Sequence, residues 1–124
     1  MRNYRNLKAF QLADELVLMV YTATKRFPKD ELFGLTSQLR RAVVSIPSNI
    51  VEGASRDTEV EFLRFLDMAY GSASELDYQI SLAYRLGYIE EKPYFPLRDK
   101  STETAKVLNG LIRSLRKKPK DKGL

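Results

Sequence analysis

The sequence predicts an all-α protein, an antiparallel up-down-up-down four-helix bundle whose second helix is kinked at Pro47. Two observations support this fold. Four segments carry apolar residues at spacings of three and four, which is the period of a helix. Short connectors separate these segments, and no segment shows the alternation of a β-strand. Four helices joined by short connectors typically form such a bundle.

The chain has 124 residues, the size of one ordinary domain. We expect residues 1–118 to form the bundle and residues 119–124 to form a basic, frayed tail. There is no run of about 18 apolar residues that could span a membrane, and the N-terminus lacks the apolar core of a signal peptide. We therefore expect a cytoplasmic protein without a membrane partner.

The first helix is predicted from about Asn6 to Arg26, where apolar residues recur at helical spacing. Phe27 and Pro28 end it, because the residue before a proline is pushed out of the helical region.

The second helix begins between Gly34 and Thr36 and ends near Gly53. Its apolar stripe continues in phase through Pro47, which favours a kinked helix over a loop. Proline in a helix interior costs about 3 kcal/mol. Ser45, Ser48 and Asn49 are short polar residues that can bond the backbone groups freed there. A helix divided into two pieces is the alternative.

The third helix has the clearest signature. Thr58 and Glu61 form a predicted capping box at its start. A strict heptad seam follows, made of Phe62, Leu66, Ala69, Ala73, Leu76, Ile80, Ala83 and Gly87. Gly71 lies in mid-helix, where glycine costs about 1 kcal/mol relative to alanine, so we expect it to have a packing reason.

The fourth helix is predicted from about Leu97 to Lys118, and the stretch GYIEEKPYFP before it is read as a connector. Its basic end dominates the charge of the molecule. Residues 113–124 hold six basic side chains and one acidic one, whereas residues 1–112 are neutral overall. This asymmetry indicates a polyanionic partner, with a solvated tail as the alternative.

The chain contains neither cysteine nor histidine. Disulfides, thiolate nucleophiles, thiolate zinc sites and histidine ligands or general bases are therefore excluded. We expect no enzymatic activity, no metal and no cofactor.

Two stretches carry a family resemblance: LTSQLRRAVVSIPSNIVEGASR at residues 35–56 and FLRFLDMAYGSASELDYQISLAYRLGYI at residues 62–89. They resemble a bacterial four-helix-bundle family named for reading frames in intervening sequences of 23S ribosomal RNA genes. That family also includes the accessory proteins of diversity-generating retroelements. The resemblance covers nearly the whole chain, although Val51 stands where a smaller alanine is expected.

The matching positions in the first stretch are Gln38, Arg40, Arg41, Ala42, Ser45, Ile46, Pro47, Asn49, Glu52, Gly53 and Arg56. In the second they are Ala69, Gly71, Ser72, Glu75, Leu76, Gly87 and Tyr88. The resemblance implies a homo-oligomer, often a five-fold ring, without enzymatic activity. It also implies a nucleic-acid role, and the retroelement accessory proteins bind reverse transcriptase and RNA.

Two sets of basic residues are candidates for binding nucleic acid. Arg40 and Arg41 could bind phosphate, with Arg56 as a neighbour; alternatively, one of them pairs with a carboxylate such as Glu52 or Glu75. The second set lies at the C-terminal end and comprises Arg113, Arg116, Lys117, Lys118 and Lys120. Binding by this set would be directed at phosphate and sensitive to salt.

The residues after Pro47 have two interpretations. Asn49 and Glu52 lie three apart and share a helical face, so a weak Mg²⁺ site is conceivable. We favour a structural role, in which they satisfy backbone and arginine groups around the bend.

Two functions follow from these observations. The first is an oligomeric nucleic-acid-binding protein, with RNA favoured over DNA. The second is a scaffold or accessory subunit that docks a reverse transcriptase or other nucleic-acid enzyme without binding nucleic acid itself.

Overall fold

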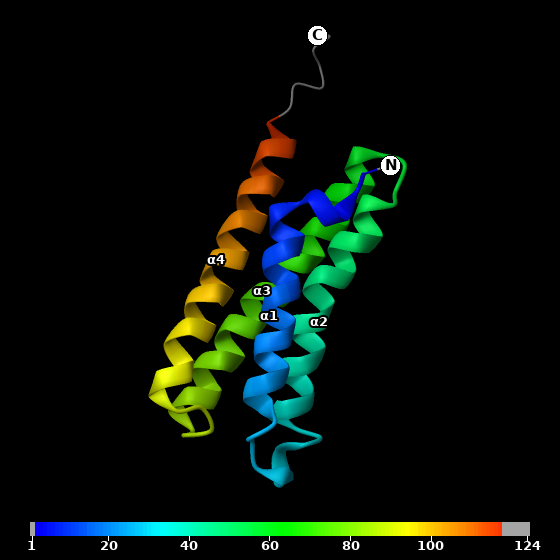
Figure 1. Cartoon of the computed structure of the whole chain (residues 1–124). Helices are drawn as coiled ribbons and strands as arrows, with labels where there is room; N and C mark the ends of the chain where they lie inside the picture. Colours follow the sequence, from blue (N-terminus) through cyan, green and yellow to red (C-terminus); the bar gives the residue numbers. More distant parts are fainter. Residues whose placement is uncertain (1, 118–124) are drawn as a thin grey trace.

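A computed structural model describes residues 2–117, which form four long helices and two short 3₁₀ turns (Figure 1). The helices are α1 (Lys8–Thr24), α2 (Leu35–Ala54), α3 (Glu59–Arg85) and α4 (Glu91–Arg116). The turns η1 (Tyr4–Asn6) and η2 (Lys29–Glu31) precede α1 and α2. The described residues contain no strand, so the prediction of an all-α four-helix bundle is confirmed.

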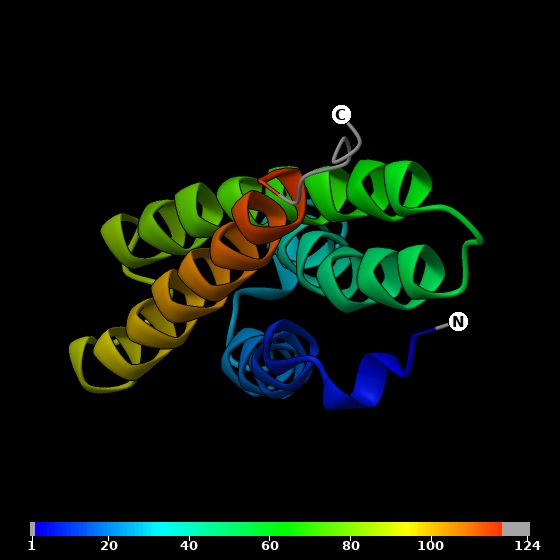
Figure 2. The same ribbon diagram turned by 90° about the horizontal axis from the view of Figure 1, so that it is seen from above.

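Each helix packs against the next one along the chain, and α1 also packs against α4. In Figure 1 the α1–α2 and α3–α4 connections lie at the lower end of the bundle, and the α2–α3 connection lies at the upper end. Residues that begin α1 and residues that end α4 therefore lie at the same end. Figure 2 shows the end of α4 beside α3 in the view along the bundle.

The predicted heptad seam of α3 is the centre of the core. Its seven helical members, from Phe62 to Ala83, are all buried. They pack with buried residues of the other three helices, among them Leu16, Leu39, Ile46, Ile50 and Leu108. Gly87 lies after the helix at φ +81°, a left-handed conformation that favours glycine at a helix end.

Two local predictions concern the start of α3 and the interior of α2. Thr58 is the N-cap of α3, and its Oγ1 accepts a bond from the Glu61 N–H at 3.1 Å. The helix α2 runs without interruption through Pro47, which is buried, so the division into two pieces is not observed. A bend of its axis at Pro47 stays a prediction.

The predicted start of the fourth helix is wrong. The helix α4 begins at Glu91 rather than near Leu97, and the Tyr94 N–H already donates to the Glu90 carbonyl at 3.0 Å. Pro93 is the third residue of the helix, where a backbone N–H would have no helical partner in any case. The Tyr94 ring stacks on Tyr84 of α3 at a centroid distance of 3.8 Å, which anchors this first turn despite Pro96.

Across residues 2–117, none of the helices is both long and apolar enough to traverse a bilayer. In the same region, no three Asp or Glu side chains gather into a group that could hold a metal ion.

Candidate nucleic-acid interface

The predicted basic residues fall into two separate places. Arg40 and Arg41 lie in the first half of α2, whereas Arg56 follows the other end of that helix. At 1.5 Å per residue, Arg40 and Arg56 are about 24 Å apart along the axis, so they do not form one site. Arg113, Arg116 and Lys117 lie at the end of α4, and Lys118 and Lys120 lie outside the described residues.

At the end of α4, the three predicted residues differ in their surroundings. Arg116 donates to Asp67 of α3 at 2.5 Å, and this ion pair offsets its charge. Arg113 and Lys117 are both exposed and lie one turn apart, and neither forms an ion pair within residues 2–117. Their charges therefore remain available to a phosphate group.

More basic residues from other elements occupy the same end of the bundle. Arg5 lies in η1, Lys8 is the first residue of α1, and Arg64 lies in the second turn of α3. All three are exposed. The sequence does not group these residues with the end of α4, because only the folded arrangement brings the start of α1 and the end of α4 to one end of the bundle (Figure 1).

Arg56 has a structural environment of its own. Its Nη2 donates to Glu52 Oε2 at 2.9 Å, and its guanidinium lies over the Phe65 ring at 4.8 Å from the centroid. Its carbonyl accepts a bond from Arg2 Nη1 at 3.2 Å. Arg56 thus connects the N-terminal segment, α2 and α3. Its ion-pair partner, Glu52, is one of the two carboxylates predicted as partners of Arg40 or Arg41.

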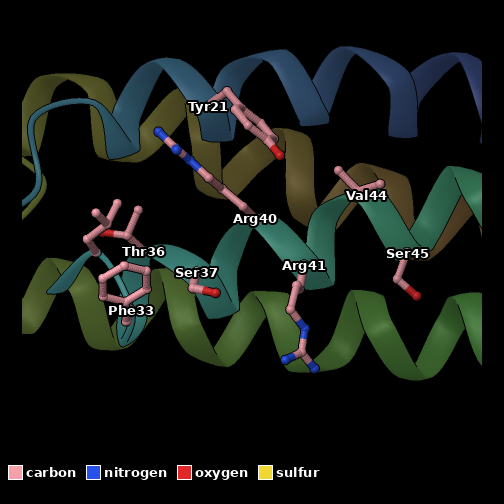
Figure 3. Close-up of a pocket in the computed structure, with 9 residues that line it drawn as sticks. Tyr21, Phe33, Thr36, Ser37, Arg40, Arg41, Val44 and Ser45 are labelled. Atoms are coloured by element: carbon pink, nitrogen blue, oxygen red, sulfur yellow. The ribbon is translucent and has the colours of Figure 1, made fainter.

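Among residues 2–117, Arg40 forms no ion pair with a carboxylate, contrary to one of the two predicted alternatives. Its Nε donates to Thr24 Oγ1 at 2.9 Å, and its guanidinium covers the Tyr21 ring at 4.6 Å (Figure 3). Tyr21 and Thr24 lie three residues apart on the last turn of α1, a spacing that could have identified them as the partners of an arginine.

Arg41 points from α2 toward α3 (Figure 3). It lines a polar groove between these helices together with Gln38, Ala42, Ser45, Ser72 and Glu75. The guanidinium of Arg41 and the carboxylate of Glu75 share this groove, but they are not within 4.0 Å of each other, the limit for an ion pair. Glu75 Oε2 instead accepts a bond from Gln79 Nε2 at 3.3 Å.

The polar residues around Pro47 bond within the protein. Asn49 Nδ2 donates to the Ser45 carbonyl at 2.9 Å and to Ser45 Oγ at 3.0 Å. Ser72 Oγ of α3 donates to the same hydroxyl at 2.9 Å. Pro47 has no backbone N–H, so the Val43 carbonyl lacks its usual helical donor. Asn49 does not replace that donor, because its side chain bonds the Ser45 carbonyl instead.

The two glycines of the predicted structural motif have opposite environments. A Cβ atom at Gly53 would lie 2.7 Å from Phe65 Cβ, so glycine is needed for the close approach of α2 and α3. A Cβ atom at Gly71 would meet nothing within 4 Å, and this residue is exposed. The packing reason expected for Gly71 is therefore not found among the described residues.

Glu31 and Tyr88 form a polar link that the sequence did not reveal. Glu31 Oε1 accepts a bond from the Leu35 N–H at 3.0 Å, and Glu31 Oε2 accepts one from the Tyr88 hydroxyl at 2.9 Å. The Leu35 N–H, and then the Tyr88 hydroxyl, lower the pKa of Glu31. The bond to Glu31 raises the pKa of Tyr88.

An aromatic groove beside Arg40 was also missed. It lies where α1, the α1–α2 connection and α2 meet, and Phe33 is 93% exposed at its edge (Figure 3). Leu32, Val44 and Tyr21 are exposed around it. The sequence placed Phe33 in a connector, where helical periodicity gives no information about exposure.

Comparison with known proteins supplies the family. A family model described as 23S rRNA-intervening sequence protein matches residues 5–110. The chain belongs to this family. No curated protein matches it in sequence.

A solved structure shares the fold of this family member. It is a protein of unknown function from the S23 ribosomal protein family of Bacteroides thetaiotaomicron, with a TM-score of 0.77 and 25% sequence identity. The match covers 85% of this chain and 95% of that chain.

Proposed function

We propose that this 23S rRNA-intervening sequence protein is a non-enzymatic homo-oligomer that binds nucleic acid through the basic end of its bundle. The observation that supports this proposal is the pair Arg113 and Lys117, which are exposed and free of ion pairs among residues 2–117. Arg5, Lys8 and Arg64 add positive charge at the same end.

The chemistry of these residues favours phosphate over bases. Lysine and arginine side chains on a helix surface contact phosphates without reading a sequence, and their contribution falls as salt rises. RNA is the favoured polymer because the family is described by an intervening sequence of ribosomal RNA. In a homo-oligomer, several basic ends act together and raise the overall affinity without new contacts.

Non-enzymatic action is part of the proposal. The chain has no histidine or cysteine, the residues that most often serve as general base or nucleophile at neutral pH. Release of nucleotides from RNA by highly purified protein would contradict this part.

The experiment compares binding to structured RNA and to duplex DNA between about 50 and 200 mM salt. The variants are a truncation after Ile112 and the double substitution Arg113→Gln with Lys117→Gln. We expect the double substitution to weaken binding and to reduce the slope of log affinity against log salt by about two per chain. The matched control is Lys25→Gln with Arg26→Gln, which removes two exposed charges from the opposite end. Unchanged binding by the truncated chain would contradict the proposal.

A second candidate function rests on the aromatic groove at Phe33, which is typical of a protein contact rather than a phosphate contact. In this alternative, the bundle is a scaffold or accessory subunit that docks a nucleic-acid enzyme, such as a reverse transcriptase. The same experiment separates the two functions, because the scaffold alone would not bind RNA or DNA even at low salt.

A further inference from the structure

The aromatic groove lies between the end of α1 and the first half of α2, and Figure 3 shows side chains that line it. Its apolar part consists of Tyr21, Leu32, Phe33 and Val44, all of which are exposed. Phe33 is 93% exposed, and none of the four belongs to the hydrophobic core of residues 2–117. Apolar side chains that gather on a surface in this way mark a site that another molecule covers.

An unpartnered hydroxyl lies at the same place. Thr36 lines the groove, and its side chain is only 4% exposed. Its Oγ1 has no hydrogen-bond partner among residues 2–117, whereas buried polar groups in proteins nearly always have one. Ser37 and Ser45 add two more hydroxyls along the groove. An occupant with backbone amides and carbonyls could supply the bond that Thr36 lacks.

Both charged residues of the groove are basic. Arg40 is held by Thr24 and by the ring of Tyr21. Arg41 is exposed and forms no ion pair within the described part of the chain. The whole chain also carries a net charge of +5. Charge complementarity therefore favours an acidic partner over a second copy of this basic chain.

The apolar side chains favour a protein segment over a nucleic acid. Bases bind to proteins largely by stacking on aromatic rings. Leu32 and Val44 are aliphatic, and Arg40 already covers the ring of Tyr21. Among the residues that line the groove, Phe33 is then the one ring left for stacking. The side chains of a protein, in contrast, can pack against aliphatic and aromatic residues alike.

Glu75 gives a second reason to favour a protein. It is exposed and shares the adjoining polar groove with Arg41. A strand of RNA or DNA would bring a row of phosphates past this carboxylate, and like charges close together cost free energy. A single carboxylate needs to contact only the Arg41 guanidinium, which can bind it with two parallel hydrogen bonds.

The dimensions of the groove fit one helix. Along α2 the lining residues extend from Thr36 to Ser45, about 14 Å at 1.5 Å per residue. The groove has a volume of about 590 Å³, which is room for a few side chains. An amphipathic helix presents apolar side chains at positions i, i+3 and i+7, over about 10 Å.

We infer that the aromatic groove binds an acidic amphipathic helix of another protein. Apolar side chains of that helix cover Phe33, Leu32 and Val44, and one of its carboxylates pairs with Arg41. The inference rests on the scaffold function given above as the second candidate. It adds to that function the docking site and the chemistry of the partner segment.

The first test selects binders of the intact protein from a phage-displayed library of random peptides of about 16 residues, a little more than four helical turns. Peptides retained by the wild type are then tested on Phe33→Asp, which places an unpaired carboxylate among apolar side chains. We expect the enriched peptides to carry apolar residues at spacings of three and four together with Asp or Glu, and to be lost on this variant.

The matched control is Val60→Asp, which places the same charge at another exposed apolar position and should retain the peptides. Both variants should give the circular dichroism spectrum of the wild type, since Phe33 and Val60 lie outside the hydrophobic core. Enriched peptides that lack acidic residues, or a selection in which no peptide depends on Phe33, would overturn the inference.

The second test uses the charge of Arg41. Fluorescence anisotropy measures binding of the most enriched peptide and of the same peptide with its acidic residue replaced by lysine. Arg41→Glu should weaken binding of the acidic peptide by about tenfold or more, because two like charges then face each other. The lysine peptide should bind Arg41→Glu more tightly than it binds the wild type, a reversal that an unfolded variant could not produce. Binding of both peptides that does not depend on Arg41 would overturn the inference.

Two further measurements identify other occupants of the groove. If Phe33→Asp has a lower molar mass than the wild type in light scattering, a second copy of the chain covers the groove. If structured RNA displaces the peptide from a protein that carries Arg113→Gln and Lys117→Gln, the groove binds RNA. Either result would overturn the inference.

Failure of the inference is distinguishable from failure of the scaffold function. The scaffold function fails if the chain alone binds RNA or DNA at low salt, a result that does not depend on the peptides. The inference fails if peptide binding does not require Phe33 and Arg41, a result that does not depend on RNA.

Discussion

Glu31 links the α1–α2 connection to the α3–α4 connection, both of which lie at the lower end of the bundle in Figure 1. It caps the first turn of α2 through the Leu35 N–H and accepts a bond from Tyr88, which follows α3. Gly34 makes this possible, because a Cβ atom there would lie 2.7 Å from Glu31 Oε1. The link is therefore specified jointly by residues far apart in the sequence, which is why the sequence alone did not reveal it.

The lowered pKa of Glu31 makes a prediction about pH. A carboxylate whose folded pKa lies below its ordinary value of 4.5 stabilises the fold above that value, and this stabilisation is lost as pH falls through the folded pKa. We expect Glu31→Gln to be less stable than the wild type at neutral pH, and the difference to shrink below about pH 4. Urea unfolding over a pH series measures this, with Asp30→Asn as the control. A difference that stays constant with pH would contradict the role of the charge.

Gly53 gives a prediction about packing. Alanine normally stabilises a helix by about 1 kcal/mol relative to glycine. At this position, however, its Cβ would collide with Phe65 Cβ, so we expect Gly53→Ala to lower the free energy of unfolding by about 1–3 kcal/mol.

The control for Gly53 is Gly110→Ala in α4, where a Cβ meets nothing within 4 Å. This substitution should raise the free energy of unfolding by about 0.5–1 kcal/mol. Thermal and urea unfolding measure both variants. Equal effects of the two substitutions would show that close packing at Gly53 does not matter.

The presence of four helices and the buried face of α3 could be predicted from the sequence. Helical periodicity, a heptad seam and an N-cap residue depend only on residues that are close along the chain. The start of α4 could not. Pro93 and Pro96 resemble a connector, but stacking of Tyr94 on Tyr84 holds this segment in the helix. The partner of Arg40 was missed for the same reason, since it depends on how α1 and α2 face one another.

The heptad seam of α3 predicts where a smaller side chain lowers the free energy of unfolding most. Leu66 is fully buried in the middle of the core, so Leu66→Ala should lower the free energy of unfolding by about 2–5 kcal/mol. Met68→Ala, two residues further on an exposed side, should change it by about 0.5 kcal/mol or less. Urea unfolding of the two variants checks this. A comparable loss for both would mean that Met68 is also covered, as it would be in an assembly.

At the scale of the whole molecule, the two proposed functions occupy opposite ends. The basic residues Arg113 and Lys117 lie where α4 ends, whereas Phe33 lies at the α1–α2 connection (Figure 1). A substitution at one end can therefore test its own function without altering the residues of the other.

This separation makes a prediction about binding. Phe33→Asp leaves the basic residues at the end of α4 in place. We therefore expect this variant to bind a long RNA and a short RNA as tightly as the wild type. Fluorescence anisotropy with RNAs of two lengths measures this. Weaker binding by the variant would show that the aromatic groove also contacts RNA.

The close approach of α2 and α3 at Gly53 also bears on the order of folding. These helices are neighbours along the chain, so their pairing requires only a short loop to close, whereas α1 and α4 must close almost the entire chain. We expect the α2–α3 hairpin to form in the transition state and α1 to dock on α4 afterwards. Substitutions at Gly53 would then slow refolding, and loss of the Glu15–Lys100 ion pair between α1 and α4 would instead speed unfolding.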